Sequence, residues 1–332
     1  MLKLQCFMIK AYCVLFLGGT ERVIMPQNLN NNVNGNGYAP TTNENIHKTV
    51  VGIIITLIVV SMIAAICIAA FNSSRNSNNS NVAKKENYKV VINDLRGKDS
   101  PANFNKTGGI LTSKLGYNKP VDGAPTVALY FDPLCPGCGQ FSRNVDKYLI
   151  NMTKAGQINL EIHPMSFLDA ASSDHYSSRV SGGLAYIAVN DPDPIHMLEF
   201  MNNMFAEDFQ PEEGSGYKPV SDQKIADLAV KSGVLREIAD EAFTRKYVEW
   251  QNRVNTAVPD YKNLWNVSGP NKGGMTTPTV TVNNKIVDLY TASEKNMDSL
   301  DAILKSIDLS KDEIGVEGKM PKVKANEEPR GL

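Results

Sequence analysis

Cys135 and Cys138, separated by Pro136 and Gly137, are the residues of this 332-residue chain whose types and spacing could do chemistry. A thiolate attacks a disulfide, and a neighbouring thiol can then resolve the mixed disulfide or close an intramolecular one. The chain has five cysteines, but only these two occur after residue 85. A structural disulfide framework would need several distributed cysteines, so the pair indicates redox chemistry or half of a metal site.

The sequence around the pair predicts which elements hold it. Residues 126–131 form a near-continuous apolar run, typical of a buried strand, and residues 139–155 carry apolar side chains on one helical face. Cys135 would then stand at a helix N-terminus, where unpaired N–H groups and the helix dipole stabilise an anion. The pKa of a cysteine in such a motif falls to roughly 3.5–7.5 from about 8.5. We therefore expect Cys135 to be the nucleophile and Cys138 the resolving cysteine, with Pro136 in the first helical turn.

Two other interpretations of the pair fit the sequence less well. A zinc site would need two further ligands at a suitable spacing. No second cysteine pair follows, and His163, His175 and His196 do not form a paired zinc signature. Inert core cysteines would not need proline and glycine between them at a strand-to-helix turn. We therefore predict neither a metal site nor a bound cofactor.

The rest of the domain is predicted to alternate between strands and helices. Ser221 is the expected N-cap of one helix, and Asn283-Asn284 the expected turn of a hairpin. The expected elements are strands at 88–92 and 158–162, a mainly helical stretch at 172–256 with one long helix at 236–254, hairpin strands at 279–282 and 286–289, and a closing helix at 293–307.

Two separated stretches, residues 127–138 and 274–284, resemble the DsbA-like branch of the thioredoxin superfamily. The specific features are Cys-Pro-x-Cys after a strand and, far downstream, Thr-Pro-Thr before a hairpin. The resemblance covers about residues 88–308, and the helical stretch between the motifs matches the helical insertion of that branch. It implies an α/β thioredoxin-like fold with a helical insertion and a thiol–disulfide oxidoreductase activity.

The resemblance also implies a role for Thr277 and Pro278. In this family the proline at that position follows a cis peptide bond and lies against the active-site sulfurs. The backbone of Thr277 could then pair with an extended substrate strand beside the cysteines. Without the cysteine motif, Pro278 would only be expected to begin an edge strand, where proline is tolerated.

The sequence departs from the family pattern at two positions. Gly137 stands where strong oxidants often have histidine, and its presence predicts a less oxidising couple. Many relatives carry a buried acid six residues before the first cysteine, but here that residue is Leu129. Asp132 is the nearest carboxylate, and it either takes over proton transfer or caps the turn.

The N-terminal part is predicted to anchor the domain in a membrane. Residues 49–71 contain no charged side chain, and roughly 20 apolar residues suffice to cross a bilayer. Residues 1–48 are expected to be a disordered tail, in which residues 1–24 are either a weak signal sequence or lie before a true start at Met25. A flexible linker is expected at 72–87, the redox domain at 88–309, and a disordered tail at 310–332.

Two observations give opposite predictions for the side of the membrane on which the domain lies. Arg75, Lys84, Lys85 and Lys89 follow the span, whereas Lys48 precedes it, and this count alone favours a cytoplasmic domain. Stable disulfides, however, belong to extracytoplasmic compartments. We give the chemistry more weight and predict a single-pass membrane protein with an extracytoplasmic catalytic domain.

Three functions follow from these observations. The first is an oxidase that donates its disulfide to exported proteins and is reoxidised by a membrane partner, a quinone-linked protein. The second is a reductase or isomerase that a membrane partner keeps reduced. The third is an anchored binding module without catalysis. The formal net charge of −1 and the absence of a basic stripe argue against a nucleic-acid partner.

Overall fold

The computed structural model describes residues 94–332. The predicted N-terminal tail, the membrane span at 49–71, the linker and the strand at 88–92 therefore lie outside the described residues. None of the helices between residue 94 and the C-terminus combines the length and the hydropathy that crossing a membrane requires.

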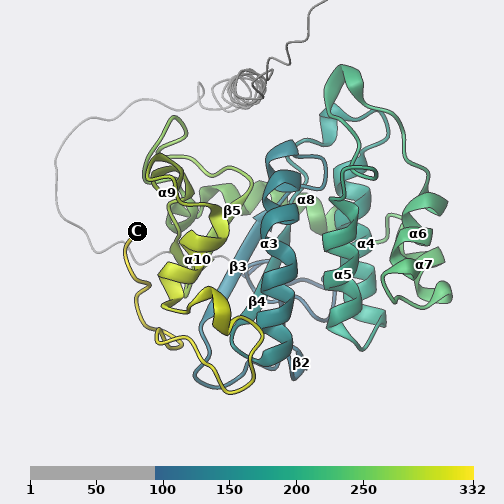
Figure 1. Ribbon diagram of the computed structural model, residues 1–332. Helices are drawn as coiled ribbons and strands as arrows, with labels where there is room; N and C mark the ends of the chain where they lie inside the picture. The colour runs from purple at the N-terminus through teal and green to yellow at the C-terminus, as the bar shows by residue number, and fades with distance from the viewer. Residues whose placement is uncertain (1–93) are drawn as a thin grey trace, which may run out of the picture. The chain divides into compact units, whose positions relative to one another are not determined.

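A mixed six-stranded sheet forms the centre of the described domain (Figure 1). The strands run in the order β2-β1-β4-β3-β5-β6. Neighbours β3 and β4 are parallel, and the other pairs are antiparallel. The strands are β1 (Ile110–Ser113), β2 (Gly116–Tyr117), β3 (Thr126–Phe131), β4 (Asn159–Pro164), β5 (Thr279–Val282) and β6 (Lys285–Ile286).

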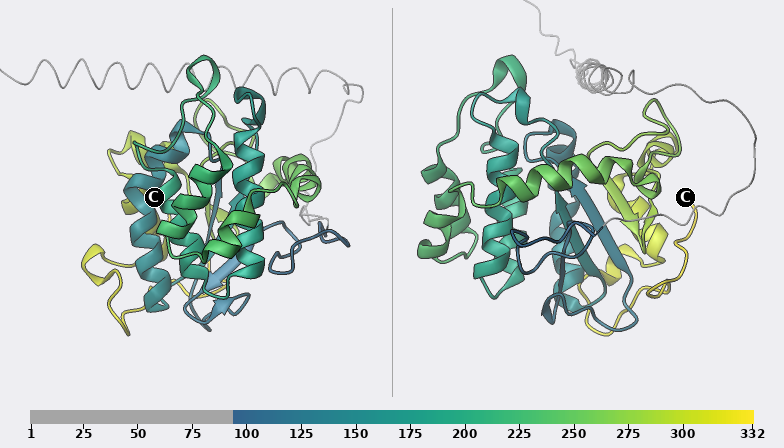
Figure 2. Two further views of the ribbon diagram at one scale, coloured as in Figure 1. Left: turned by 90° about the vertical axis from the view of Figure 1, so that its right-hand side faces the viewer. Right: turned by 180° about the vertical axis from the view of Figure 1, so that it is seen from behind.

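Helices cover both faces of this sheet. Helices α3 and α10 lie on one face (Figure 1), and α8 crosses the opposite face (Figure 2). Helices α4 to α7 form a separate layer beside the sheet, on the right of Figure 1. The helices are α3 (Pro136–Ala155), α4 (Tyr176–Asn190), α5 (Pro194–Met204), α6 (Asp222–Lys231), α7 (Arg236–Ala242), α8 (Val248–Ala257), α9 (Leu289–Glu294) and α10 (Ser299–Ile307).

Strand β3 and helix α3 are the elements that place the cysteines. The apolar side chains of β3 are buried because helices cover both faces of the sheet. Helix α3 begins at Pro136 and buries Phe141, Val145 and Leu149 against the core. It ends at Gly156, whose φ of 73° lets its N–H reach back to the last carbonyls of the helix. The predicted strand and helix around the motif are confirmed.

Other predicted elements are confirmed in part. The Ser221 hydroxyl accepts a hydrogen bond from the N–H of Lys224 and caps α6, as predicted. Asn283 and Asn284 form the hairpin turn with φ values of 49° and 66°, the conformation that a two-residue hairpin turn requires. The second hairpin strand is shorter than predicted, because the chain enters α9 after β6.

Two long helices were predicted where the structure has broken ones. The stretch 236–254 divides into α7 and α8, and Arg245 in the connection between them has a φ of 63°. The stretch 293–307 is also broken. Helix α9 ends at Glu294, and the side chain of Asp298 caps a new helix, α10. Neither break contains the proline that would mark it in a sequence.

The prediction of a disordered tail at residues 310–332 disagrees with the structure. Val323 is fully buried, and its N–H donates to the carbonyl of Ile307. Two side-chain amides from the body of the domain hold the rest of the segment. Gln157 binds the carbonyls of Glu313 and Lys319 and the N–H of Gly315, and Asn283 donates to the carbonyls of Lys324 and Glu327. Tertiary hydrogen bonds therefore order a segment whose composition is polar.

Replacing Gln157 by alanine should destabilise the domain. The side chain is buried and makes hydrogen bonds of 2.7, 2.6 and 2.8 Å to the C-terminal segment. Loss of these partners leaves backbone groups unsatisfied, so the free energy of unfolding should fall by about 1–3 kcal/mol. Urea denaturation measures this change, and Gln140→Ala, at an exposed position of α3, is the control. Equal stability of the two variants would contradict the role given to Gln157.

Candidate functional site

The two cysteines lie where β3 passes into α3. Cys135 is the N-cap residue of α3, with φ −68° and ψ 120°, and its N–H donates to the carbonyl of Asp132. Both cysteines are free thiols. Cys135 is partly exposed, whereas Cys138 retains 1% of its accessible surface. One sulfur can therefore meet another protein, and the second lies behind it.

The segment predicted to bind substrate lies against the cysteines. The carbonyl oxygen of Thr277 lies 3.5 Å from Cys135 Sγ, and the Thr277–Pro278 peptide bond is cis. A Cβ atom placed on Gly137 would lie 3.6 Å from Pro278 Cδ and 3.7 Å from Cys135 Sγ. The structure thus brings together residues that are 142 positions apart in the sequence.

The two thiols have opposite pKa shifts. The hydrogen bond from Cys138 to the Cys135 sulfur lowers the pKa of Cys135, because it stabilises the thiolate. Burial raises the pKa of Cys138 well above its ordinary value. The N–H of Asp132 also donates to Cys138 Sγ over 3.4 Å. Cys135 is therefore the thiol that ionises first, in agreement with its expected role as nucleophile.

Asp132 is fully buried beneath the motif. Its carboxylate accepts hydrogen bonds from the N–H of Leu134 at 2.9 Å, the N–H of Leu168 at 2.9 Å and the hydroxyl of Ser177 at 2.6 Å. Burial raises its pKa to about 6. These bonds show Asp132 capping the active-site turn and tying it to α4. A role in proton transfer stays a prediction.

Two residues of the helical layer contact the site and were not found from the sequence. Ser177 binds Asp132, and the side-chain amide of Gln210 donates to the carbonyls of Pro133 and Cys135. Gln210 is 75 positions away from Cys135. No local pattern marks such contacts, because they depend on how α4 and α5 pack beside the sheet.

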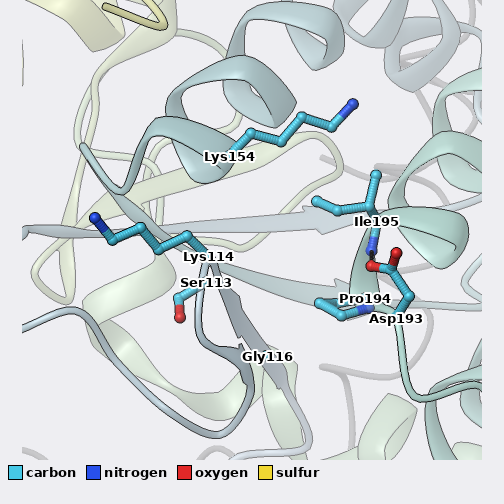
Figure 3. Close-up of a pocket in the computed structure, with 7 residues that line it drawn as sticks. All are labelled: Ser113, Lys114, Gly116, Lys154, Asp193, Pro194 and Ile195. Carbon is cyan, nitrogen blue, oxygen red and sulfur yellow. Dashed lines mark hydrogen bonds between the residues drawn. The ribbon is translucent and has the colours of Figure 1, made fainter. Parts of the chain in front are cut away.

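Two pockets in the described part of the chain lie away from the cysteines. One, of about 180 Å³, is lined by Ser113, Lys114, Gly116, Lys154, Asp193, Pro194 and Ile195 (Figure 3). A second adjoins the C-terminal end of α3 and the segment around Gly315. Neither contains a predicted site residue. Between residues 94 and 332, no group of three or more His, Cys, Asp or Glu side chains could hold a metal ion.

Comparisons with known proteins find a matching family model and similar sequences. A family model described as Thioredoxin matches residues 121–306. The chain is 31% identical over 105 residues to the serine/threonine-protein kinase PknE of Mycobacterium tuberculosis, a stretch covering 31% of this chain and 18% of that protein. The chain thus spans about a fifth of the length of the curated relatives it matches.

Solved structures of similar fold come from several bacteria. Reduced DsbA from Mycobacterium tuberculosis is 24% identical, with a TM-score of 0.44, over 56% of this chain and 90% of that one. MdbA, a thiol-disulfide oxidoreductase from Actinomyces oris, is 17% identical, with a TM-score of 0.47, over 65% of this chain and 91% of that one.

Proposed function

Because this chain belongs to the thioredoxin family, we propose that it is a thiol–disulfide oxidoreductase of the DsbA type that acts through Cys135 and Cys138. The observation that carries the proposal is the pairing of a partly exposed thiol of lowered pKa with a buried thiol of raised pKa at the start of one helix. The exposed sulfur forms the intermolecular bond. The buried sulfur is the leaving group in the oxidase direction, and in the reductase direction it displaces the substrate from Cys135.

In the oxidase direction, the reaction begins from the Cys135–Cys138 disulfide. A substrate thiolate attacks Cys135 Sγ, the bond to Cys138 breaks, and the Cys138 thiolate takes up a proton. A second substrate thiolate then attacks the substrate sulfur of the mixed disulfide and expels the Cys135 thiolate. The substrate loses two electrons and two protons and gains a disulfide, and the pair becomes a dithiol.

The substrates in this proposal are thiols or disulfides of exported proteins. Thr277 and Pro278 border Cys135, so an extended substrate segment would lie along their backbone while its sulfur reaches Cys135.

The direction of electron flow follows from the stability of the Cys135 thiolate. Lowering the pKa of Cys135 stabilises the reduced form and makes the couple more oxidising, which favours the oxidase. Gly137 leaves the reductase or isomerase as the second candidate, because the motif lacks the histidine of strong oxidants. We expect a reduction potential above about −230 mV, measured for residues 94–332 against glutathione. A potential near the thioredoxin value of about −270 mV would favour the reductase.

The proposed location is the outer side of a membrane, with residues 49–71 as the anchor and a membrane redox partner that reoxidises the pair. The support is the apolar, uncharged character of that stretch and the preference of disulfide chemistry for extracytoplasmic compartments. A membrane-impermeant maleimide applied to intact cells should label Cys135 of the full-length chain. Labelling only after lysis would place the domain on the cytoplasmic side.

A further inference from the structure

Gln210 belongs to the segment that follows α5, yet its side chain contacts the active-site turn. Its amide Nε2 donates to the carbonyl of Cys135 at 3.0 Å and to that of Pro133 at 3.2 Å. The Cys135 carbonyl also accepts the N–H of Gly139 at 3.1 Å. The peptide group of the nucleophile is therefore held by a donor from its own helix and by one from the helical layer.

The position of Gln210 is fixed by its neighbours. Phe205, which is buried, packs edge-on against Phe131 at the end of β3, with 5.8 Å between ring centroids. Arg143 on α3 donates to the carbonyl of Phe205 at 2.8 Å and to Gln210 Oε1 at 3.5 Å. The N–H of Gln210 donates to the carbonyl of Ala206 at 2.9 Å. Both ends of the amide are therefore bound.

Gly139 provides the space that the amide occupies. A Cβ atom at this position would lie 2.8 Å from Gln210 Cδ and 2.9 Å from Arg143 Nη1, and it would overlap Gln210 Oε1. Any larger residue at 139 would push the amide away from the turn. The first turn of α3 and the segment after α5 are thus complementary in shape at this point.

We propose that Gln210 is a positioning residue for Cys135, which fixes the peptide group of the nucleophile so that its sulfur faces the Thr277 carbonyl. This inference rests on the proposed function. Two bound donors keep the Cys135 peptide group from rotating, and they offset the partial negative charge of its carbonyl oxygen near the thiolate. Small displacements of a reacting atom can lower a rate by about 10²-fold, so the geometry should matter for exchange.

The experiment compares Gln210→Ala with Gln223→Ala, an exposed glutamine of α6, in the reduced full-length protein. The rate of Cys135 alkylation by iodoacetamide is measured from pH 5 to pH 10. The titratable or charged groups in or beside the site are Asp132, Cys138, Arg143 and Glu207, and all are unchanged in both variants. In Gln210→Ala the rate at neutral pH should fall about tenfold and its inflection should move to higher pH, whereas Gln223→Ala should match the wild type.

A second variant distinguishes a positioning role of Gln210 from a general loss of structure. Gly139→Ala keeps Gln210 but displaces its amide, and alanine is a better helix former than glycine. It should reproduce the slower alkylation and the raised inflection, and a cooperative thermal transition checks that the variant is folded. A wild-type rate of Cys135 alkylation in either folded variant would overturn the positioning role of Gln210. If Gln210→Ala does not fold, the result for Gly139→Ala decides the question. An unreactive Cys135 in the wild type would instead contradict the proposed function itself.

Discussion

Replacing Cys135 by serine should abolish disulfide exchange with a reduced model substrate, because the accessible sulfur is lost and Cys138 retains only 1% of its surface. Rates should fall to the uncatalysed background, a loss of at least about 10³-fold, as expected when a covalent nucleophile is removed. A gel assay of disulfide transfer to reduced, unfolded ribonuclease measures the effect. If Cys135→Ser exchanged disulfides as fast as the wild-type protein, the wild-type rate would not come from catalysis by Cys135. The non-catalytic binding module would then be the remaining function.

The corresponding change at Cys138 should give a different result. In Cys138→Ser, the exposed Cys135 thiolate can still attack a substrate disulfide and form a mixed disulfide with release of one substrate thiolate, but the buried sulfur that would displace the substrate is absent. Mixed disulfides with substrate should therefore accumulate and be visible on non-reducing gels. Equal trapping by the two single variants would contradict the assignment of nucleophile and resolving cysteine.

Replacing Asp132 by alanine should cause the largest loss of stability among the changes considered. The carboxylate is fully buried and accepts hydrogen bonds from Leu134, Leu168 and Ser177. Alanine leaves two buried donors, on Leu134 and Ser177, and one part-buried donor, on Leu168, without this acceptor, and each buried donor costs about 1–3 kcal/mol. The free energy of unfolding should fall by at least about 3 kcal/mol, measured by urea denaturation. A loss below about 1 kcal/mol would show that the turn does not depend on this carboxylate.

The isosteric change Asp132→Asn should alter how stability depends on pH. Burial raises the pKa of Asp132 from 3.8 to about 6, so folding favours the protonated form. This contribution is complete below pH 3.8 and is lost as the pH rises through 6. Asparagine cannot ionise, and the variant should gain roughly 2–3 kcal/mol relative to the wild type between pH 4 and pH 7.

The matched control is Asp146→Asn. Asp146 is also buried, burial likewise raises its pKa to about 6, and it bonds only to Ser142 among the described residues. Its variant should show a similar change in the pH dependence of stability but no change in disulfide exchange. Parallel pH curves for Asp132→Asn and the wild type would contradict the raised pKa of Asp132. An exchange rate in Asp132→Asn that equals the wild-type rate would remove the proton-transfer role.

Local sequence patterns were sufficient to predict the elements that hold the cysteines. An apolar run of strand length followed by Cys-Pro-Gly-Cys and an amphipathic stretch led directly to β3 and α3, because both patterns reflect burial along a single element. The position of Thr277 and Pro278 beside Cys135 came from the family resemblance. Nothing local to residues 277 and 278 indicates a partner 142 positions earlier.

The parts that could not be predicted depend on contacts between distant elements. The break between α7 and α8 contains Arg245 with a positive φ, and its residue type gives no signal of that conformation. The order of residues 310–332 depends on Gln157 and Asn283, whose amides bind carbonyls of that segment. Gln210 reaches the active-site turn from a distant segment, in which Phe205 packs against Phe131.

The most direct test of the account is the pH dependence of alkylation at each cysteine of the reduced wild-type protein, followed by mass spectrometry of the modified peptides. Cys135 should be modified first, with an inflection clearly below the value of about 8.5 for a free cysteine, while Cys138 should react only after unfolding. Equal modification of the two cysteines, or an inflection for Cys135 at or above about 8.5, would contradict it.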